Sequence, residues 1–145
     1  MKAVRHFGIV TSDIGRSLHF YRDLLGLKIE RDMLEEGEFI DAILGLENVR
    51  VRTIKMRAEH ADALVELLFY ESHPKRAMSN NELPNRGASH IAFTVEDVDA
   101  EYKKLKEGGV RFNCSPQMSP GGKAKVTFCY DPDGVPVELV QEFQA

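Results

Sequence analysis

Hydrophobic and polar positions along the chain repeat in two similar halves. The segment from His6 to Ile14 aligns without a gap with the segment from His90 to Val98. In each copy a short apolar strand runs into an acidic helix cap, and a helical pattern of apolar residues then continues until a glycine ends it. A repeat of this kind indicates a duplicated structural unit.

After each helix the pattern changes to that of β-strands. The first helix is expected from Ile14 to Leu25 and the second from Val98 to the glycine pair at 108–109. The predicted strands of the first half lie near 28–33, 38–44, 49–56 and 62–70, and those of the second near 110–113, 124–130 and 135–142. The stretch Asp131-Pro132-Asp133-Gly134 predicts a turn between the last two strands.

The halves also end alike, because Val65-Glu66-Leu67-Leu68 matches Val137-Glu138-Leu139-Val140. Each half is interpreted as a βαβββ module, module one at 1–72 and module two at 87–145. A linker at 73–86, rich in Pro, Ser and Asn, joins them. One module has too little sheet to bury both faces. We therefore predict a single α+β domain, 1–145, with a curved mixed sheet and the helices outside it.

Four polar residues fall on comparable faces of these strands. His6 and His90 project beside small residues, while the larger apolar residues of their strands point the other way. Glu66 and Glu138 lie among apolar neighbours, and neither final strand offers a cation on the same face. An ionised carboxylate is costly to bury in such surroundings unless it is paired or coordinated.

Two neutral imidazoles and two carboxylates carry two negative charges, which neutralise a divalent ion and leave room for one or two waters. Each residue alone would more often be structural or solvated, but their recurrence in both modules favours a common role. The sequence therefore predicts a cleft with one divalent metal ion bound by four ligands: His6, Glu66, His90 and Glu138. These donors suit Zn²⁺, Ni²⁺, Co²⁺, Mn²⁺ or Fe²⁺ and do not select among them.

Composition narrows the class of partner. The chain has 145 residues, 43% of them hydrophobic, and a net charge of −4 with scattered basic residues. This distribution of charge provides no basic surface that would bind nucleic acid or an anionic membrane. No signal peptide or membrane-spanning run is found, so we expect a cytoplasmic protein that acts on a small molecule. Cys114 and Cys129 match no metal-pair spacing and are expected to be free thiols.

The chain resembles the vicinal oxygen chelate superfamily, which includes glyoxalase I, methylmalonyl-CoA epimerase, extradiol dioxygenases, fosfomycin-resistance enzymes and bleomycin-binding proteins. The resemblance covers nearly the whole chain. The segments that carry it are residues 6–10 with 16–27, 65–67, 90–93 with 95–99, and 131–134 with 137–139. It implies the glyoxalase/bleomycin-resistance/dioxygenase-like fold. The predicted ligands match, in order, the His-Glu-His-Glu set of glyoxalase I, the lactoylglutathione lyase.

This resemblance implies a metal-dependent lyase or isomerase that converts a hemithioacetal to a thioester, with glutathione as cosubstrate. Glu138, or Glu66 in a symmetric role, would remove the proton next to a metal-bound carbonyl. Because no glutathione-contact motif is recognised after Glu66, a methylmalonyl-CoA epimerase-like or other isomerase activity stays open. An extradiol dioxygenase is less favoured, since Glu66 as a fourth ligand fills a position that an oxygenase needs open. Metal-free drug binding is also less favoured.

The superfamily also leads us to expect a homodimer, in which one site is built within a chain or across two. The Gly-rich loop 119–123 could close over a substrate, and Arg50, Arg52 or Lys123 could meet an anionic group, although ordinary surface roles are favoured for them. The remaining histidines have no counterpart in the repeat and are expected at the surface. They are His19, His60 and His73.

Overall fold

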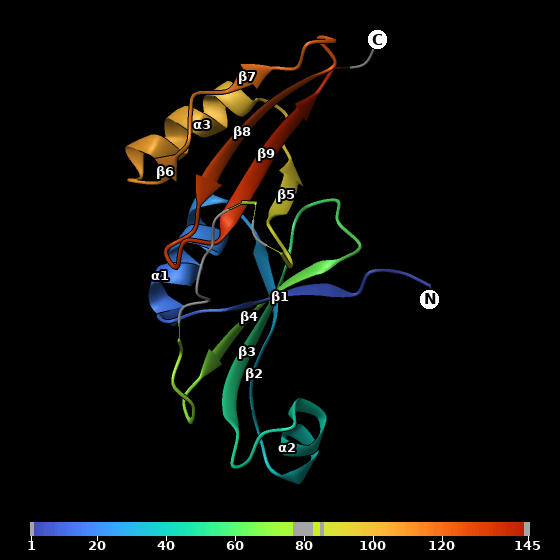
Figure 1. The fold of residues 1–145 in the computed structure, drawn as a ribbon, viewed down its shortest axis with the longest axis vertical. Coiled ribbons are helices and arrows are strands. Elements are labelled where there is room, and N and C mark those ends of the chain that lie inside the picture. The colour runs from blue at the N-terminus through green and yellow to red at the C-terminus, as the bar shows by residue number, and fades with distance from the viewer. Residues whose placement is uncertain (1, 77–82, 85, 144–145) are drawn as a thin grey trace. The chain divides into compact units, whose positions relative to one another are not determined.

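The computed structural model describes residues 2–76, 83–84 and 86–143, and it divides into two compact units, Met1–Ala77 and Met78–Ala145 (Figure 1). Each unit contains a strand, a helix and then further strands, so the predicted α+β fold of two repeated modules is confirmed. The linker predicted at 73–86 lies partly outside the described residues. Within the described part of the chain, no helix is long and apolar enough to cross a membrane.

The first unit contains one four-stranded sheet in the order β1-β4-β3-β2. Its strands are β1 (His6–Val10), β2 (Lys28–Glu36), β3 (Arg50–Arg57) and β4 (Leu64–Tyr70). β1 runs parallel to β4, and the other neighbours are antiparallel. One face of this sheet is closed by buried apolar side chains, namely Ile9, Ile54, Met56, Val65 and Leu67. The other face carries the polar residues of interest.

The helix between β1 and β2 begins as predicted. Helix α1 (Ile14–Leu18) starts after Asp13, whose side chain accepts a hydrogen bond from the Arg16 backbone N–H at 3.0 Å. The helix then continues as a π-helical turn at His19–Leu24. Gly26 follows with φ of 78°, a conformation that suits glycine and ends the helix before β2.

The segment Glu38–Leu44 is a helix, α2, so the strand predicted at 38–44 is wrong. Its apolar residues recur at helical spacing, and Gly45 ends it in the left-handed conformation, with φ of 64°. Periodicity over so few residues does not distinguish a helix from a strand, which is why the short apolar run predicts the wrong element. Ile40 forms a buried cluster with residues of the sheet and its loops, and these are Val49, Val51, Leu68 and Tyr70.

The second unit repeats this plan without an equivalent of α2 among its described residues. Its elements are β5 (Ile91–Thr94), α3 (Val98–Glu107), β6 (Arg111–Phe112), β7 (Gln117–Met118), β8 (Ala124–Tyr130) and β9 (Pro136–Glu142). The sheet order is β5-β9-β8-β6, and β7 also pairs with β8. The predicted turn between β8 and β9 is present, because the Asp131 carboxylate accepts hydrogen bonds from the backbone N–H groups of Asp133 and Val135.

Candidate metal centre

In the first unit, the pairing of β1 with β4 brings His6 and Glu66 together. The two strands are parallel with Gly8 opposite Glu66, and His6 shares the face of Gly8 because side chains alternate along a strand. His6 Nε2 lies 3.1 Å from Glu66 Oε2, and the Glu66 side chain is only 9% exposed. Glycine suits position 8, since a Cβ there would lie 3.3 Å from Leu68 Cδ1.

The second unit builds the same pair by the same register. β5 is parallel to β9 with Ala92 opposite Glu138, and the repeat had aligned Ala92 with Gly8. His90, which directly precedes β5, has its Nε2 3.1 Å from Glu138 Oε2. On the other side of the ring, Ser89 Oγ lies 2.6 Å from His90 Nδ1. The serine contact holds the imidazole with Nε2 toward the carboxylate.

Glu66 has a second polar neighbour that is not apparent from the sequence. Lys55 of β3 lies opposite Glu66 in the antiparallel pairing, and its Nζ is 3.4 Å from Glu66 Oε1. The strand of Glu66 supplies no cation on this face, as expected, but the neighbouring strand β3 does. In the second unit Phe128 stands opposite Glu138, with its ring centroid 5.1 Å from that of His90.

Both pairs are suited to a divalent metal ion. Two donors bound roughly 2.1 Å from one ion and at right angles lie roughly 3.0 Å apart, and each pair has its N and O atoms 3.1 Å apart. A direct hydrogen bond has a similar length, so the distance within one pair does not identify a metal. The described residues contain no group of three or more potential ligands already gathered together, and the two pairs belong to different units.

The family of the chain follows from comparison with known proteins. The family model of the Glyoxalase/Bleomycin resistance protein/Dioxygenase superfamily matches residues 3–139. The chain belongs to this superfamily.

Two relatives and one solved structure illustrate the similarity to other superfamily members. The lactoylglutathione lyase of Schizosaccharomyces pombe is 28% identical over 144 residues, which cover 96% of this chain but 47% of that protein, so this chain spans about half its length. A probable lactoylglutathione lyase of Synechocystis sp. is 30% identical over 137 residues, covering 94% of this chain and 92% of that protein. The structure of a glyoxalase family protein from Bacillus cereus has a TM-score of 0.89 at 20% identity, covering 99% and 96% of the two chains.

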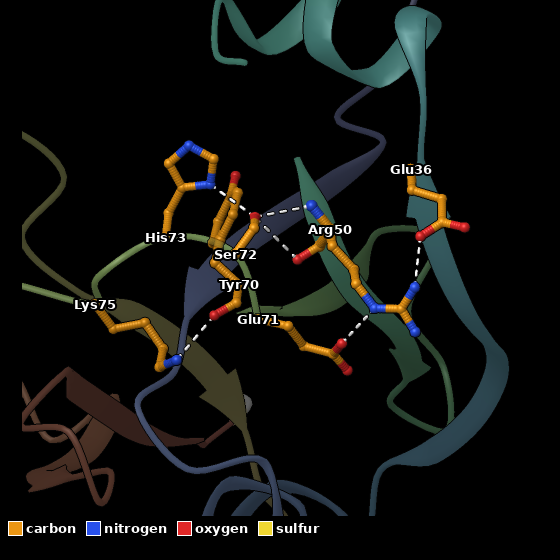
Figure 2. A network of polar contacts seen from close by, with 7 residues as sticks. All are labelled: Glu36, Arg50, Tyr70, Glu71, Ser72, His73 and Lys75. Carbon is orange, nitrogen blue, oxygen red and sulfur yellow. Dashed lines mark hydrogen bonds and ion pairs between the residues drawn. The ribbon is translucent and has the colours of Figure 1, made fainter. Parts of the chain in front are cut away.

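In this member of the superfamily, the two arginines considered as contacts for an anionic group already have carboxylate partners. Arg50 donates to Glu36 at 2.6 Å and to Glu71 at 2.7 Å (Figure 2). Arg52 donates two hydrogen bonds to Asp32, at 2.8 and 2.6 Å. These bonds favour the ionised carboxylate, so the pKa of Asp32 is lowered from its ordinary value. Both arginines therefore have structural roles.

The residues around Arg50 connect the start of β3 to the segment that follows β4. The Arg50 backbone N–H donates to Ser72 Oγ at 2.8 Å, and Ser72 Oγ also lies 2.7 Å from His73 Nδ1 (Figure 2). Lys75 Nζ donates to the carbonyl oxygen of Tyr70 at 2.8 Å. His73 is half-buried at the surface of the unit, between exposed neighbours. The other two unmatched histidines, at 19 and 60, are exposed as predicted.

The remaining candidates of the second unit have ordinary surroundings. Lys123 is exposed, and its loop is closed by a hydrogen bond from the Ser119 N–H to the Ala124 carbonyl oxygen at 2.8 Å. Both cysteines are free, as predicted, with Cys114 exposed and Cys129 buried. Burial raises the pKa of the Cys129 thiol to about 12, so this thiol stays protonated and unreactive.

Proposed function

We propose that this chain is a divalent-metal-dependent lyase or isomerase of the glyoxalase I type, which converts a hemithioacetal to a thioester. The observation that carries the proposal is the repeated His/Glu pair, with the same 3.1 Å separation in both units. The similarity to proteins named lactoylglutathione lyase supports the same reaction class. Glutathione would then be the cosubstrate.

In this proposal four side chains hold one ion of Zn²⁺, Ni²⁺, Co²⁺, Mn²⁺ or Fe²⁺, and they are His6, Glu66, His90 and Glu138. The histidines would hold the ion through Nε2, the atom that faces the carboxylate in each pair. A bound ion would supply polarisation of the substrate carbonyl and stabilisation of the negative charge on its oxygen. We expect a cytoplasmic homodimer in which each ion takes its two pairs either from one chain or from both.

Glu138 is the better candidate for the general base. Its side chain is 22% exposed, against 9% for Glu66, and it therefore has more freedom to move toward a substrate. Glu66 is held between the ammonium group of Lys55 and the imidazole of His6. Glu138 would take the proton from the carbon that bears sulfur and return a proton to the adjacent carbonyl carbon, so that the net change is an isomerisation.

Loading the protein with each of the five ions and supplying methylglyoxal with glutathione tests the proposal. We expect thioester formation that stops on chelation and returns when the ion is restored. At saturating metal, Glu138→Gln is expected to lower kcat by about a hundredfold or more, because the positioned base is lost. Glu66→Gln is the matched control and is expected to weaken metal binding more than it lowers kcat. No turnover with any of the ions would contradict the lyase assignment.

A second candidate reaction is epimerisation of an acyl-thioester, which uses the same proton transfer next to a carbonyl. It is favoured by Lys55, which places a positive charge beside Glu66 where a carboxylate of such a substrate could be bound. Solvent deuterium exchange into methylmalonyl-CoA, without hemithioacetal turnover, would select this reaction. If the protein neither turns over the hemithioacetal nor exchanges solvent deuterium into methylmalonyl-CoA, it is a binding protein or acts on another carbonyl compound.

A further inference from the structure

The two oxygens of the Glu66 carboxylate have different partners. Oε2 lies 3.1 Å from His6 Nε2, whereas Oε1 lies 3.4 Å from Lys55 Nζ. The spacing of the first pair of atoms suits two ligands of one ion, so Oε2 is the oxygen that would bind the metal together with His6. Lys55 contacts the other oxygen. The ammonium and a bound ion therefore do not compete for the same atom, and Lys55 keeps its partner when an ion binds.

The ion pair of Lys55 with Glu66 is better shielded from water than the other ion pairs of β3. The side chains of Lys55 and Glu66 are 23% and 9% exposed. Arg50, Arg52 and Arg57 pair with carboxylates that are each at least 38% exposed. Surrounding water weakens an exposed pair, so the attraction between Lys55 and Glu66 is the stronger restraint on a carboxylate.

The second unit lacks such a restraint on its carboxylate. Phe128 stands opposite Glu138, where Lys55 stands opposite Glu66 in the first unit. Within the described residues, the only ion pair of Glu138 is the one that its Oε2 makes with His90. One carboxylate of the proposed site is therefore held at both oxygens, and the other is held at one.

The number of oxygens that a carboxylate commits to an ion decides how many positions remain for a substrate. A carboxylate can bind through one oxygen or through both. We propose that Lys55, by holding Oε1, restricts Glu66 to one position on the ion, so that the position which Oε1 would take stays open to the substrate. This inference rests on the proposed function, whose hemithioacetal has a hydroxyl and a carbonyl oxygen on adjacent carbons. Lys55 is thus a positioning residue that acts through Glu66, and it needs one of its three N–H donors to do so.

Two anions that need different numbers of metal positions test this role. Acetohydroxamate binds an ion through two adjacent oxygens, whereas azide binds through one atom. Both bind with a single negative charge, so removing the charge of Lys55 weakens their binding alike, and the ratio of the two affinities reports the open positions. Calorimetric titration of the metal-loaded protein gives this ratio, and metal content is measured on the same samples.

The variants separate the charge of Lys55 from other effects of substitution. Lys55→Met and Lys55→Gln remove the ammonium, and Lys55→Arg keeps a cation. Lys125→Met is the matched control, because Lys125 is 24% exposed and pairs with Asp99, which is not a proposed ligand. Lys55→Met and Lys55→Gln should lower the affinity for acetohydroxamate relative to azide by about tenfold, as is common when an outer partner of a metal ligand is lost. Wild type, Lys55→Arg and Lys125→Met should share one higher ratio.

Infrared difference spectra provide a readout that needs no added anion. In the Glu138→Gln background Glu66 is the one proposed carboxylate ligand, so the difference between metal-loaded and metal-free protein contains its stretching bands. A carboxylate bound through one oxygen has a wider separation between its antisymmetric and symmetric stretches than one bound through two. The separation should narrow when Lys55→Met is added and stay wide when Lys55→Arg is added.

An affinity ratio or a band separation that Lys55→Met leaves unchanged would overturn the inference alone. Loss of the metal from Lys55→Met would also overturn it, because Lys55 would then be required to bind the ion rather than to orient its ligand. Failure of the wild type to bind any of the ions would overturn the proposed function as well.

Discussion

The two His/Glu pairs share a geometry but differ in their neighbours. Both join the first strand of a unit, or the residue just before it, to the last strand, and both have an N···O distance of 3.1 Å. The adjacent strand then brings Lys55 to Glu66 in one unit and Phe128 to Glu138 in the other. Strand register thus keeps the proposed ligands equivalent, while the residues on the next strand make one half charged and the other apolar.

Removal of one imidazole should produce the largest effect and tests whether the two pairs act together. His6→Ala and His90→Ala are each expected to lower metal affinity by about a hundredfold or more, since an ion held by four ligands loses one and gains none. Elemental analysis should fall from one ion per site to nearly none in either variant. Retention of half the metal in both variants would indicate that the pairs bind separately.

Mixing the same two variants extends this test to the source of the ligands. If each site combines the pairs of two different chains, a mixed dimer contains one intact site and should recover metal and activity. If each site lies within one chain, every chain lacks a ligand and mixing should recover neither.

An intermediate effect is expected from Ser89, which contacts the histidine of the second pair. Ser89→Ala removes the contact at His90 Nδ1, and loss of such an outer partner commonly costs about tenfold in metal affinity. Arg5, which precedes His6 in the aligned repeat, is exposed and provides the control. Arg5→Ala should leave the affinity within about twofold. An equal loss of metal affinity in Ser89→Ala and Arg5→Ala would mean that the contact of Ser89 with His90 has no specific effect on metal binding.

The smallest effect is expected at an ion pair remote from the proposed ligands. Asp32→Asn removes the carboxylate that Arg52 contacts, and because both side chains are 38% exposed the loss in unfolding free energy should be at most about 1 kcal/mol at pH 7. The pKa of Asp32 is lowered in the folded protein. Its contribution is therefore complete above the ordinary carboxyl pKa and disappears as pH falls through the lower, folded value.

Urea denaturation at several pH values measures this difference. Wild type and Asp32→Asn should converge in acid, and metal affinity should be unchanged in the variant. A difference in unfolding free energy that grows in acid, or a change in metal affinity, would contradict a purely structural role for the pair of Arg52 with Asp32.

The repeat was sufficient to predict most of the fold and to single out the four polar residues that the structure arranges as two His/Glu pairs. An alternating pattern shows which face of a strand each side chain occupies, and the two aligned segments of each half identified equivalent positions. Each of these inferences uses the sequence of a single strand and does not require knowing which strands pair. The parallel register, with Gly8 opposite Glu66 and Ala92 opposite Glu138, agrees with them.

What the sequence did not reveal depends on how separate segments pair. Lys55 becomes a neighbour of Glu66 only through the register of β3 against β4, which no local pattern specifies. The contact of Ser89 with His90 depends on side-chain orientation. Helix α2 was missed because a short segment with clustered apolar positions fits a strand as well as a helix.

The two members of each proposed ligand pair come from segments that are far apart in the sequence of their unit, and this has a consequence for biosynthesis. In the first unit, β1 begins at His6 and must pair with β4, which begins only at Leu64. Contacts between segments so distant in the sequence form slowly, after the intervening chain has been organised. A chain still emerging from the ribosome would therefore display a lone histidine, with weak affinity for metal. Because the proposed ion takes ligands from both units, its selection would follow the folding of both.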